Sequence, residues 1–233
     1  MKEILDFFLS DTSAKRGDRK LKRGNFQEAI NEYNQALSLN PNDAMSYGHR
    51  GFAFAQLGNN HRAIEDYNQA LRLDSSAAAF YNNRGISNEA LGNTKAAIED
   101  YKRVIYIDSS IPQAHFQLGV CYVKLKNYEY AVRVLSRAIA INQKYIAAYV
   151  FRGIAYAGLK KLHEAFKDYN QAIRLKPDYA KAYKSRGLAC IEIGNNIEAM
   201  EDLQKAAGLF FSQGQITEHQ EVLALTKKIK AIH

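Results

Sequence analysis

Residue types that often carry out chemistry are present in this 233-residue chain, but their spacing assembles no reactive centre. The six histidines are scattered without the spacing of metal ligands, and Cys121 and Cys190 are the only cysteines. The sequence contains no glycine-rich phosphate-binding loop and no nucleophile elbow. Adjacent carboxylates such as Glu65 and Asp66 are expected to be solvated or paired with cations. We therefore expect no enzymatic activity, no metal site and no cofactor.

One chemical pairing does recur along the chain. Arginine precedes five of six regularly spaced glycines, and an acidic residue follows each of these arginines sixteen positions later. In the sixth case both positions are apolar, with Leu118 and Val134. This covariation predicts contact between the two positions, and a structural role in preference to ligand binding. The predicted pairs are Arg16 with Glu32, Arg50 with Asp66, Arg84 with Asp100, Arg152 with Asp168, and Arg186 with Asp202.

The elements that position these pairs repeat every 34 residues. The glycines are Gly17, Gly51, Gly85, Gly119, Gly153 and Gly187, and an alanine follows each of them after twelve residues. A strict period of this length indicates a stacked repeat protein. In residues 44–77, apolar positions three or four apart predict two helices, which the Gly58 turn separates. A glycine inside a helix costs about 1 kcal/mol relative to alanine, so we expect the paired helix to approach it closely at the alanine.

At these residues the chain resembles the tetratricopeptide repeat family. The resemblance rests on Tyr47, Gly51, Phe54, Ala63, Tyr67 and Ala70, and on the equivalent residues Tyr149, Gly153, Tyr156, Ala165, Tyr169, Ala172 and Pro177. It implies an all-α fold, a right-handed α-solenoid of six helix-turn-helix repeats followed by a C-terminal capping helix. The expected parts are an N-terminal helical extension (1–9), six repeats (10–43, 44–77, 78–111, 112–145, 146–179 and 180–213) and the capping helix (214–233).

The resemblance also implies where a partner binds, because in this family the first helix of each repeat lines the concave face. Carried over by position, it predicts an apolar groove with amide groups along it. Some of these side chains are alternatively expected to fill the seams between repeats. The predicted groove residues are His49, Phe52, Asn82, Asn83, Ile86, Phe116, Gln117, Val120, Phe151, Ile154 and Leu188. We interpret the set as a site for a peptide or helix of another protein.

Charge is concentrated in the fourth and fifth repeats. The chain carries a net charge of +8, and residues 112–179 hold eleven Lys and Arg against four Asp and Glu. Four of these cations, Lys124, Lys126, Lys160 and Lys161, form a predicted basic edge at the turns between helices. The edge is interpreted either as solvated turns or as a docking place for an acidic partner. Because the charge is local, we expect no binding of nucleic acid.

The chain ends and the two thiols bear on assembly and location. No segment has the roughly 20 apolar residues that cross a bilayer, and two cysteines without a disulfide framework favour a reducing compartment. We therefore expect a cytoplasmic protein that does not insert into membranes.

The sequence leaves two main functions open. One is an adaptor that binds a partner protein in the groove. The other is a self-assembling scaffold, a homo-oligomer in which Ile4, Leu5, Phe7 and Phe8 of one chain bind another.

Overall fold

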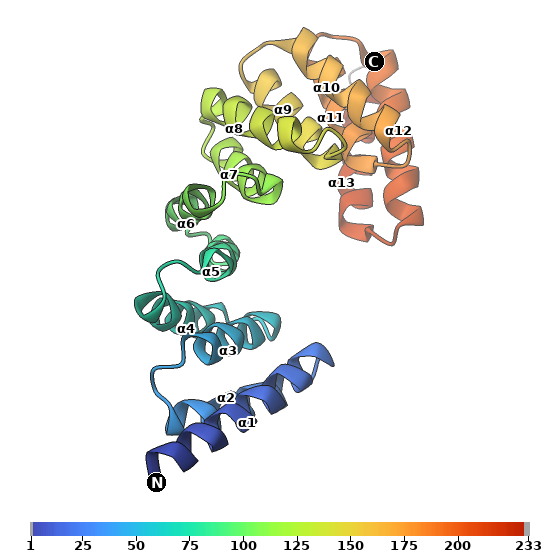
Figure 1. Cartoon of the computed structure of the whole chain (residues 1–233). Helices are drawn as coiled ribbons and strands as arrows, with labels where there is room; N and C mark the ends of the chain where they lie inside the picture. The colour runs from blue at the N-terminus through green and yellow to red at the C-terminus, as the bar shows by residue number, and fades with distance from the viewer. Residues whose placement is uncertain (1, 231–233) are drawn as a thin grey trace. The chain divides into compact units, whose positions relative to one another are not determined.

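The computed structural model describes residues 2–230, apart from the side chains of residues 2–5, 7, 8, 228 and 230. Within this range it contains thirteen α-helices and no strand, which confirms the predicted all-α class (Figure 1). The first helices of the six repeats are α1 (Lys2–Lys22), α3 (Ala44–Gln56), α5 (Ala78–Ala90), α7 (Pro112–Lys124), α9 (Ile146–Gly158) and α11 (Ala180–Glu192). The second helices are α2 (Phe26–Leu39), α4 (Asn60–Leu73), α6 (Thr94–Ile107), α8 (Tyr128–Ile141), α10 (Leu162–Leu175) and α12 (Asn196–Ser212).

Each first helix packs against the second helix of its own repeat, as the periodicity predicts. A tight turn joins the two helices, and in the second repeat Gly58 adopts a φ of +78° there, a conformation that glycine reaches without steric cost. Asn59 then caps α4, because its side-chain oxygen accepts a hydrogen bond of 3.3 Å from the Arg62 amide. Local chemistry therefore ends one helix and begins the next within three residues.

The glycines inside the first helices make room for a large side chain. A Cβ atom on Gly153 would lie 2.5 Å from the Tyr169 ring, and one on Gly119 would lie 2.5 Å from Leu135. The residue sixteen positions later thus approaches closest, whereas we expected the alanine twelve positions later. The alanine backbone comes comparably close only at Gly51, where the Ala63 oxygen is 3.1 Å from the added Cβ, and at Gly187.

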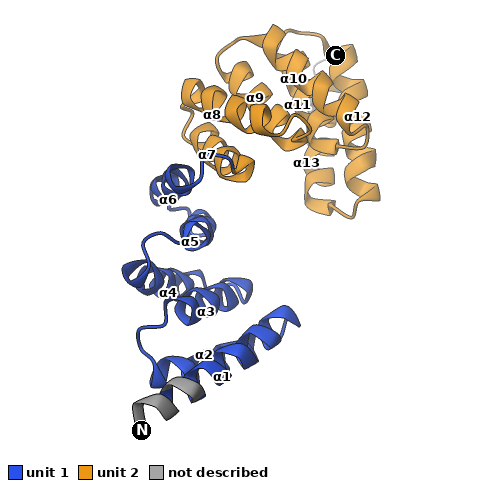
Figure 2. Cartoon of the chain, in the orientation of Figure 1, with its two compact units in different colours: residues 1–110 blue, residues 111–233 orange. Residues whose placement is uncertain are grey.

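The chain divides into two compact units, residues 1–110 and 111–233, at the junction between the third and fourth repeats (Figure 2). Each unit has its own buried core. In unit 1 the fully buried large side chains include Tyr33, Tyr67 and Tyr101. In unit 2 they include Leu135 and Tyr169, which occupy the equivalent positions of their repeats.

Both ends of the repeat array continue in helix. Helix α1 starts at Lys2, so residues 2–9 lengthen the first helix; the side chains of Ile4, Leu5, Phe7 and Phe8 lie outside the described residues. After the last repeat, α13 (Ile216–Lys230) packs against α12 and buries Val222 and Ile229 in one cluster with Leu203, Ala206 and Phe210. None of the helices in the described range combines the length and the apolar character required to cross a membrane.

Candidate functional site

The recurrent arginine and carboxylate lie in direct contact within their repeats. In the fifth repeat, Arg152 Nε and Nη2 each donate a hydrogen bond of 2.7 Å to the Asp168 carboxylate. The same paired geometry joins Arg50 to Asp66 and Arg186 to Asp202. The third repeat has the equivalent ion pair, with 2.6 Å between Arg84 Nη2 and Asp100 Oδ1. In the first repeat, Arg16 Nε donates to Glu32 at 2.7 Å.

Each of four arginines also binds the preceding repeat, a contact that the sequence analysis missed. Arg50 Nη1 donates to Asn34, Arg84 to Asn68, Arg186 to Asn170, and Arg152 to Ser136, at 2.6–3.0 Å. The recurrence of asparagine at the same position of three repeats could have indicated these contacts between repeats. The fourth repeat has Leu118, which carries no donor, and the division into two units falls at the start of that repeat. These arginines are used in packing and are not free to hold a ligand.

The same contacts keep the guanidinium groups charged. The hydrogen bond to Asp66 raises the pKa of Arg50 above its ordinary value, against the opposing effect of burial. For Arg152, burial disfavours the charge, but the hydrogen bond and the charge of Asp168 outweigh it and raise the pKa. The guanidinium groups of Arg50 and Arg152 therefore keep their positive charge throughout the physiological pH range.

The surface formed by α9 and α11, here called the first-helix face of unit 2, carries two adjoining hollows. α9 contacts both α7 and α11, and both hollows share Ile154, Ser185 and Leu188. The first hollow, of about 290 Å³, is also lined by Tyr128, Ala157, Gly158, Tyr169, Ala189 and Glu192. The second, of about 260 Å³, is also lined by Val150, Phe151, Lys181, Lys184, Phe210 and Glu218. Together they follow α11 from Lys181 to Glu192, about 16 Å at 1.5 Å per residue.

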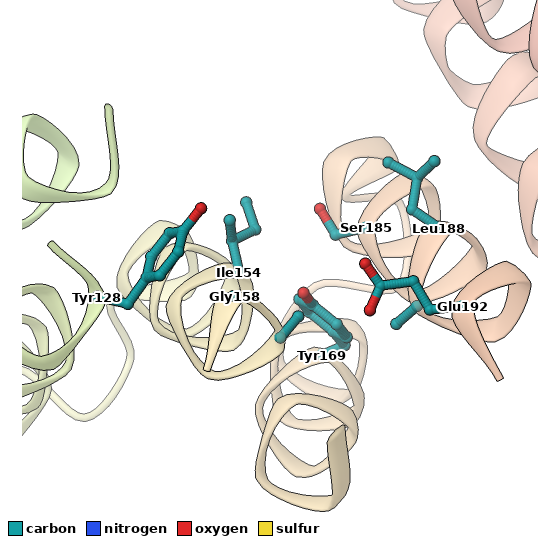
Figure 3. Close-up of a pocket in the computed structure, with 9 residues that line it drawn as sticks. Tyr128, Ile154, Gly158, Tyr169, Ser185, Leu188 and Glu192 are labelled. Carbon is teal, nitrogen blue, oxygen red and sulfur yellow. The ribbon is translucent and has the colours of Figure 1, made fainter. Parts of the chain in front are cut away.

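The first hollow combines apolar walls with hydroxyl groups and one carboxylate (Figure 3). Figure 3 shows Ile154 between Tyr128 and Ser185, with Tyr169 of α10 and the Glu192 carboxylate of α11 below Ser185 in this view. Burial raises the pKa of Tyr169, and the nearby charges of Asp168 and Glu192 raise it further. Tyr169 therefore stays protonated and can act as a hydrogen-bond donor at this place.

The structure brings only part of the predicted groove of unit 2 to these hollows. Phe151, Ile154 and Leu188 line them, and the Leu188 residue is 38% exposed. The predicted residues that line neither hollow are Phe116, Gln117 and Val120. Phe116 instead packs edge-on against Phe151, with ring centres 5.5 Å apart, and against Tyr145 at 4.9 Å. These rings close the seam between the fourth and fifth repeats, the alternative that the sequence had left open.

Several lining residues were not anticipated from the sequence. Tyr128 and Tyr169 come from second helices, which the resemblance does not place on the concave face. Lys184 reaches Glu221 of α13 at 2.7 Å, so the capping segment takes part in the second hollow through its charge. For Tyr128, the sequence did contain an indication in Gly158, because the equivalent position of the other repeats carries a side chain. Its missing Cβ admits the Tyr128 ring, which a methyl group there would approach to 2.5 Å.

In unit 1, the predicted groove residues lie on α3 and α5. His49, Phe52, Asn82 and Asn83 are partly buried, whereas Ile86 is 46% exposed. The hydroxyls of Tyr67 and Ser87 are buried near this surface, and the Asn83 side chain lies close to the Tyr67 hydroxyl. Burial raises the pKa of Tyr67, so its hydroxyl remains protonated.

His49 belongs to a small polar cluster at the first two repeats. Its Nδ1 lies 2.9 Å from an Asp18 oxygen, which also accepts a hydrogen bond of 2.7 Å from the Tyr33 hydroxyl. Asp18 therefore holds two side chains from neighbouring repeats in one arrangement. The imidazole is engaged within the protein on this side, and only its remaining nitrogen is available to another group.

The predicted basic edge lies at the turns that follow α7 and α9. Lys124, Lys126, Lys160 and Lys161 are all exposed. Lys160 Nζ lies 3.5 Å from Glu192 of α11 in an exposed ion pair. Glu129 and Glu164, in the first turns of α8 and α10, are the nearest acidic residues along the chain.

Comparisons with known proteins agree with this architecture. Structures of similar proteins include that of MamA, with 27% identity and a TM-score of 0.69 over 74% of this chain and 94% of MamA. The crystal structure of YrrB, described as a TPR protein with an unusual peptide-binding site, has 25% identity and a TM-score of 0.66 over 84% of this chain and 97% of YrrB. A tetratricopeptide repeat protein from Parabacteroides merdae ATCC 43184, at 21% identity, shares the fold with a TM-score of 0.77 over 95% of this chain and 92% of that protein. No curated protein matches the chain.

Family models match most of the repeats directly. The model described as TPR repeat matches residues 17–58, 51–92 and 153–194. Models described as tetratricopeptide repeat match residues 78–111 and 112–145. Since these ranges cover well over half of the sequence, the chain belongs to the tetratricopeptide repeat family.

Proposed function

We propose that this protein is an adaptor that binds a peptide or helix of a partner protein on the first-helix face of unit 2. The observation that carries the proposal is the pair of adjoining hollows that share Ile154, Ser185 and Leu188. Their walls are mainly apolar, and hydroxyl, ammonium and carboxylate groups lie around them. Apolar anchors of a peptide would enter the hollows, and the polar groups would fix its register.

The size and chemistry of the hollows favour a polypeptide over a small-molecule substrate. Each hollow is at or below the small end of the range for ligand pockets, roughly 300–1,000 Å³, and suits one or two side chains of a longer ligand. Tetratricopeptide repeat proteins are generally non-enzymatic adaptors. YrrB, described as having a peptide-binding site, supports a peptide as the ligand class. The two cysteines are buried and form no disulfide in the described structure, which favours a reducing compartment, and we expect the protein in the cytoplasm.

The α3 and α5 surface of unit 1 is proposed as a second contact for the same class of partner. Ile86 and Phe52 would supply apolar contacts there, and the Asn82 and Asn83 amides would bind the partner's main chain. In unit 2, Phe116 would support Phe151 through their edge-on ring contact, and Gln117 and Val120 lie outside the two hollows.

The proposal is tested by selecting peptides on the wild-type full-length protein from a displayed library and then measuring their binding to a Leu188→Asp variant. Leu188 is suitable because it is exposed, so a charge there should leave the fold intact. We expect selected peptides to bind Leu188→Asp at least tenfold more weakly, since one buried apolar side chain contributes about 1.5–3 kcal/mol. Fluorescence anisotropy with purified peptide measures this.

The matched control is Ile197→Asp, which places the same charge at an exposed apolar residue on α12 that lines neither hollow. Equal affinity of the selected peptides for wild type and Leu188→Asp would refute the proposed site. A sedimentation mass that rises with concentration and collapses when residues 1–9 are removed would instead favour the self-assembling scaffold.

A further inference from the structure

Two lysines occupy turns where the other repeats use glycine. The residue two positions after the first helix adopts a left-handed conformation in every repeat, and it is glycine in four of them, at Gly24, Gly58, Gly92 and Gly194. In the fourth and fifth repeats it is Lys126, with φ of +57°, and Lys160, with φ of +59°. A residue with a Cβ atom is strained in this region, and glycine is not.

The contacts within the protein do not account for these lysines. The Lys160 side chain is 78% exposed, and its one ion pair, with Glu192 at 3.5 Å, is of the exposed kind that contributes little. Lys126 is exposed, and its side chain has no hydrogen bond or ion pair in the part of the chain that the structure describes. Strain that the fold does not require is a reason to look for a function.

The two turns lie side by side. Tyr128, two residues after Lys126, packs against Gly158, two residues before Lys160, so closely that a Cβ atom on Gly158 would be 2.5 Å from its ring. The exposed Lys124 and Lys161 flank the same two turns. The helices around them carry four carboxylates, of which Asp168 is paired with Arg152 and the other three belong to Glu129, Glu164 and Glu192. The edge therefore concentrates four exposed lysines on two neighbouring turns.

We propose that the basic edge, Lys124, Lys126, Lys160 and Lys161, binds an acidic segment of a partner polypeptide. The exposed Leu125, between two of the lysines, offers an apolar contact that suits a polypeptide. Nucleic acid is disfavoured because the adjacent ring of Tyr130 already contacts the Arg133 guanidinium at 4.2 Å and the Tyr122 ring at 5.4 Å, which a stacking base would have to displace. This proposal is independent of binding in the hollows.

The glycine variant separates binding from folding. Replacing both lysines, as Lys126→Gly with Lys160→Gly, removes two charges and relieves two strained residues. We expect the full-length variant to melt a few degrees higher and to bind a fluorescein-labelled peptide of six glutamates and one leucine roughly two- to thirtyfold more weakly. Weaker binding by a more stable protein cannot come from unfolding.

The matched control is Lys144→Gln with Lys167→Gln, which removes the same charge from exposed lysines elsewhere in unit 2. It should bind the peptide like wild type, and Leu188→Asp should do so too. The proposal is overturned if the glycine variant binds the peptide unchanged, or if the control loses as much affinity. It is also overturned if a single-stranded oligonucleotide of equal charge binds more tightly than the peptide and depends on the same two lysines.

Discussion

The arginine–aspartate pairs lead to a prediction about stability, for which the fourth repeat of the same chain supplies the natural comparison. In the fifth repeat, the side chain of Asp168 is only 6% exposed and that of Arg152 19%. In the fourth repeat, the same two positions are Leu118 and Val134. The double substitution Arg152→Leu with Asp168→Val therefore converts one repeat to a chemistry that its neighbour already has. We expect the double variant to be far more stable than the sum of its single variants predicts.

The expected losses in the free energy of unfolding follow from the burial of the two side chains. Arg152→Leu alone leaves a carboxylate buried without its counter-charge, which costs about 3–5 kcal/mol. Asp168→Val alone costs less, about 1–3 kcal/mol, because the guanidinium keeps its bond to Ser136 and reaches solvent. The double variant removes both charges, and apolar replacement of a buried pair is often close to neutral. We expect it to lie within about 2 kcal/mol of wild type, the remaining loss coming mostly from the bond to Ser136, worth about 0.5–1.5 kcal/mol.

Urea unfolding of the four proteins, followed by far-UV circular dichroism, gives the coupling free energy between the two sites. Ser136→Ala is the control that removes only the contact with the preceding repeat. A coupling of at least about 2 kcal/mol is expected for a pair at this depth. If the losses of the single variants simply add, with coupling below about 0.5 kcal/mol, the pair behaves as an exposed one and the reasoning from burial is refuted.

Four further predictions concern glycine and thiol chemistry. Gly153→Ala should lower stability by about 1–3 kcal/mol, because the new methyl group meets the Tyr169 ring at 2.5 Å. Gly208→Ala should raise it by up to about 1 kcal/mol, since nothing lies within 4 Å of the added Cβ; thermal melts of both variants test the opposite signs. Burial raises the pKa of Cys190 to about 11, so in a Cys121→Ala background its reaction with a disulfide reagent at pH 8 should be roughly two orders of magnitude slower than in urea. The same shift means that the unfolded thiol loses its proton first, so stability should fall between about pH 8.5 and 11, and a Cys190→Ala variant should flatten that part of the pH profile.

The repeated features of the fold could be predicted because they depend on short-range rules that recur six times. The glycine and alanine spacing locates both helices of each repeat, and covariation within one chain identified which arginine faces which carboxylate. The hydrogen bond that each arginine donates to the preceding repeat was not anticipated. Its acceptor, such as Asn34 for Arg50 or Ser136 for Arg152, belongs to a different repeat from the arginine. A contact of that kind depends on how neighbouring repeats stack, which the period alone does not specify.

The candidate site was harder to predict because it depends on departures from the shared pattern. The first hollow exists where Gly158 replaces the side chain that other repeats carry, such as Gln56 or Lys124, and so admits the Tyr128 ring. Lys160 also departs from the shared pattern, since it occupies a turn position with positive φ that suits glycine better. In a repeat protein, residues that every copy shares are explained by the fold that every copy shares. Residues that one or two copies change at a cost in stability, as Lys160 does, are better candidates for binding, and the glycine substitution at that turn tests this directly.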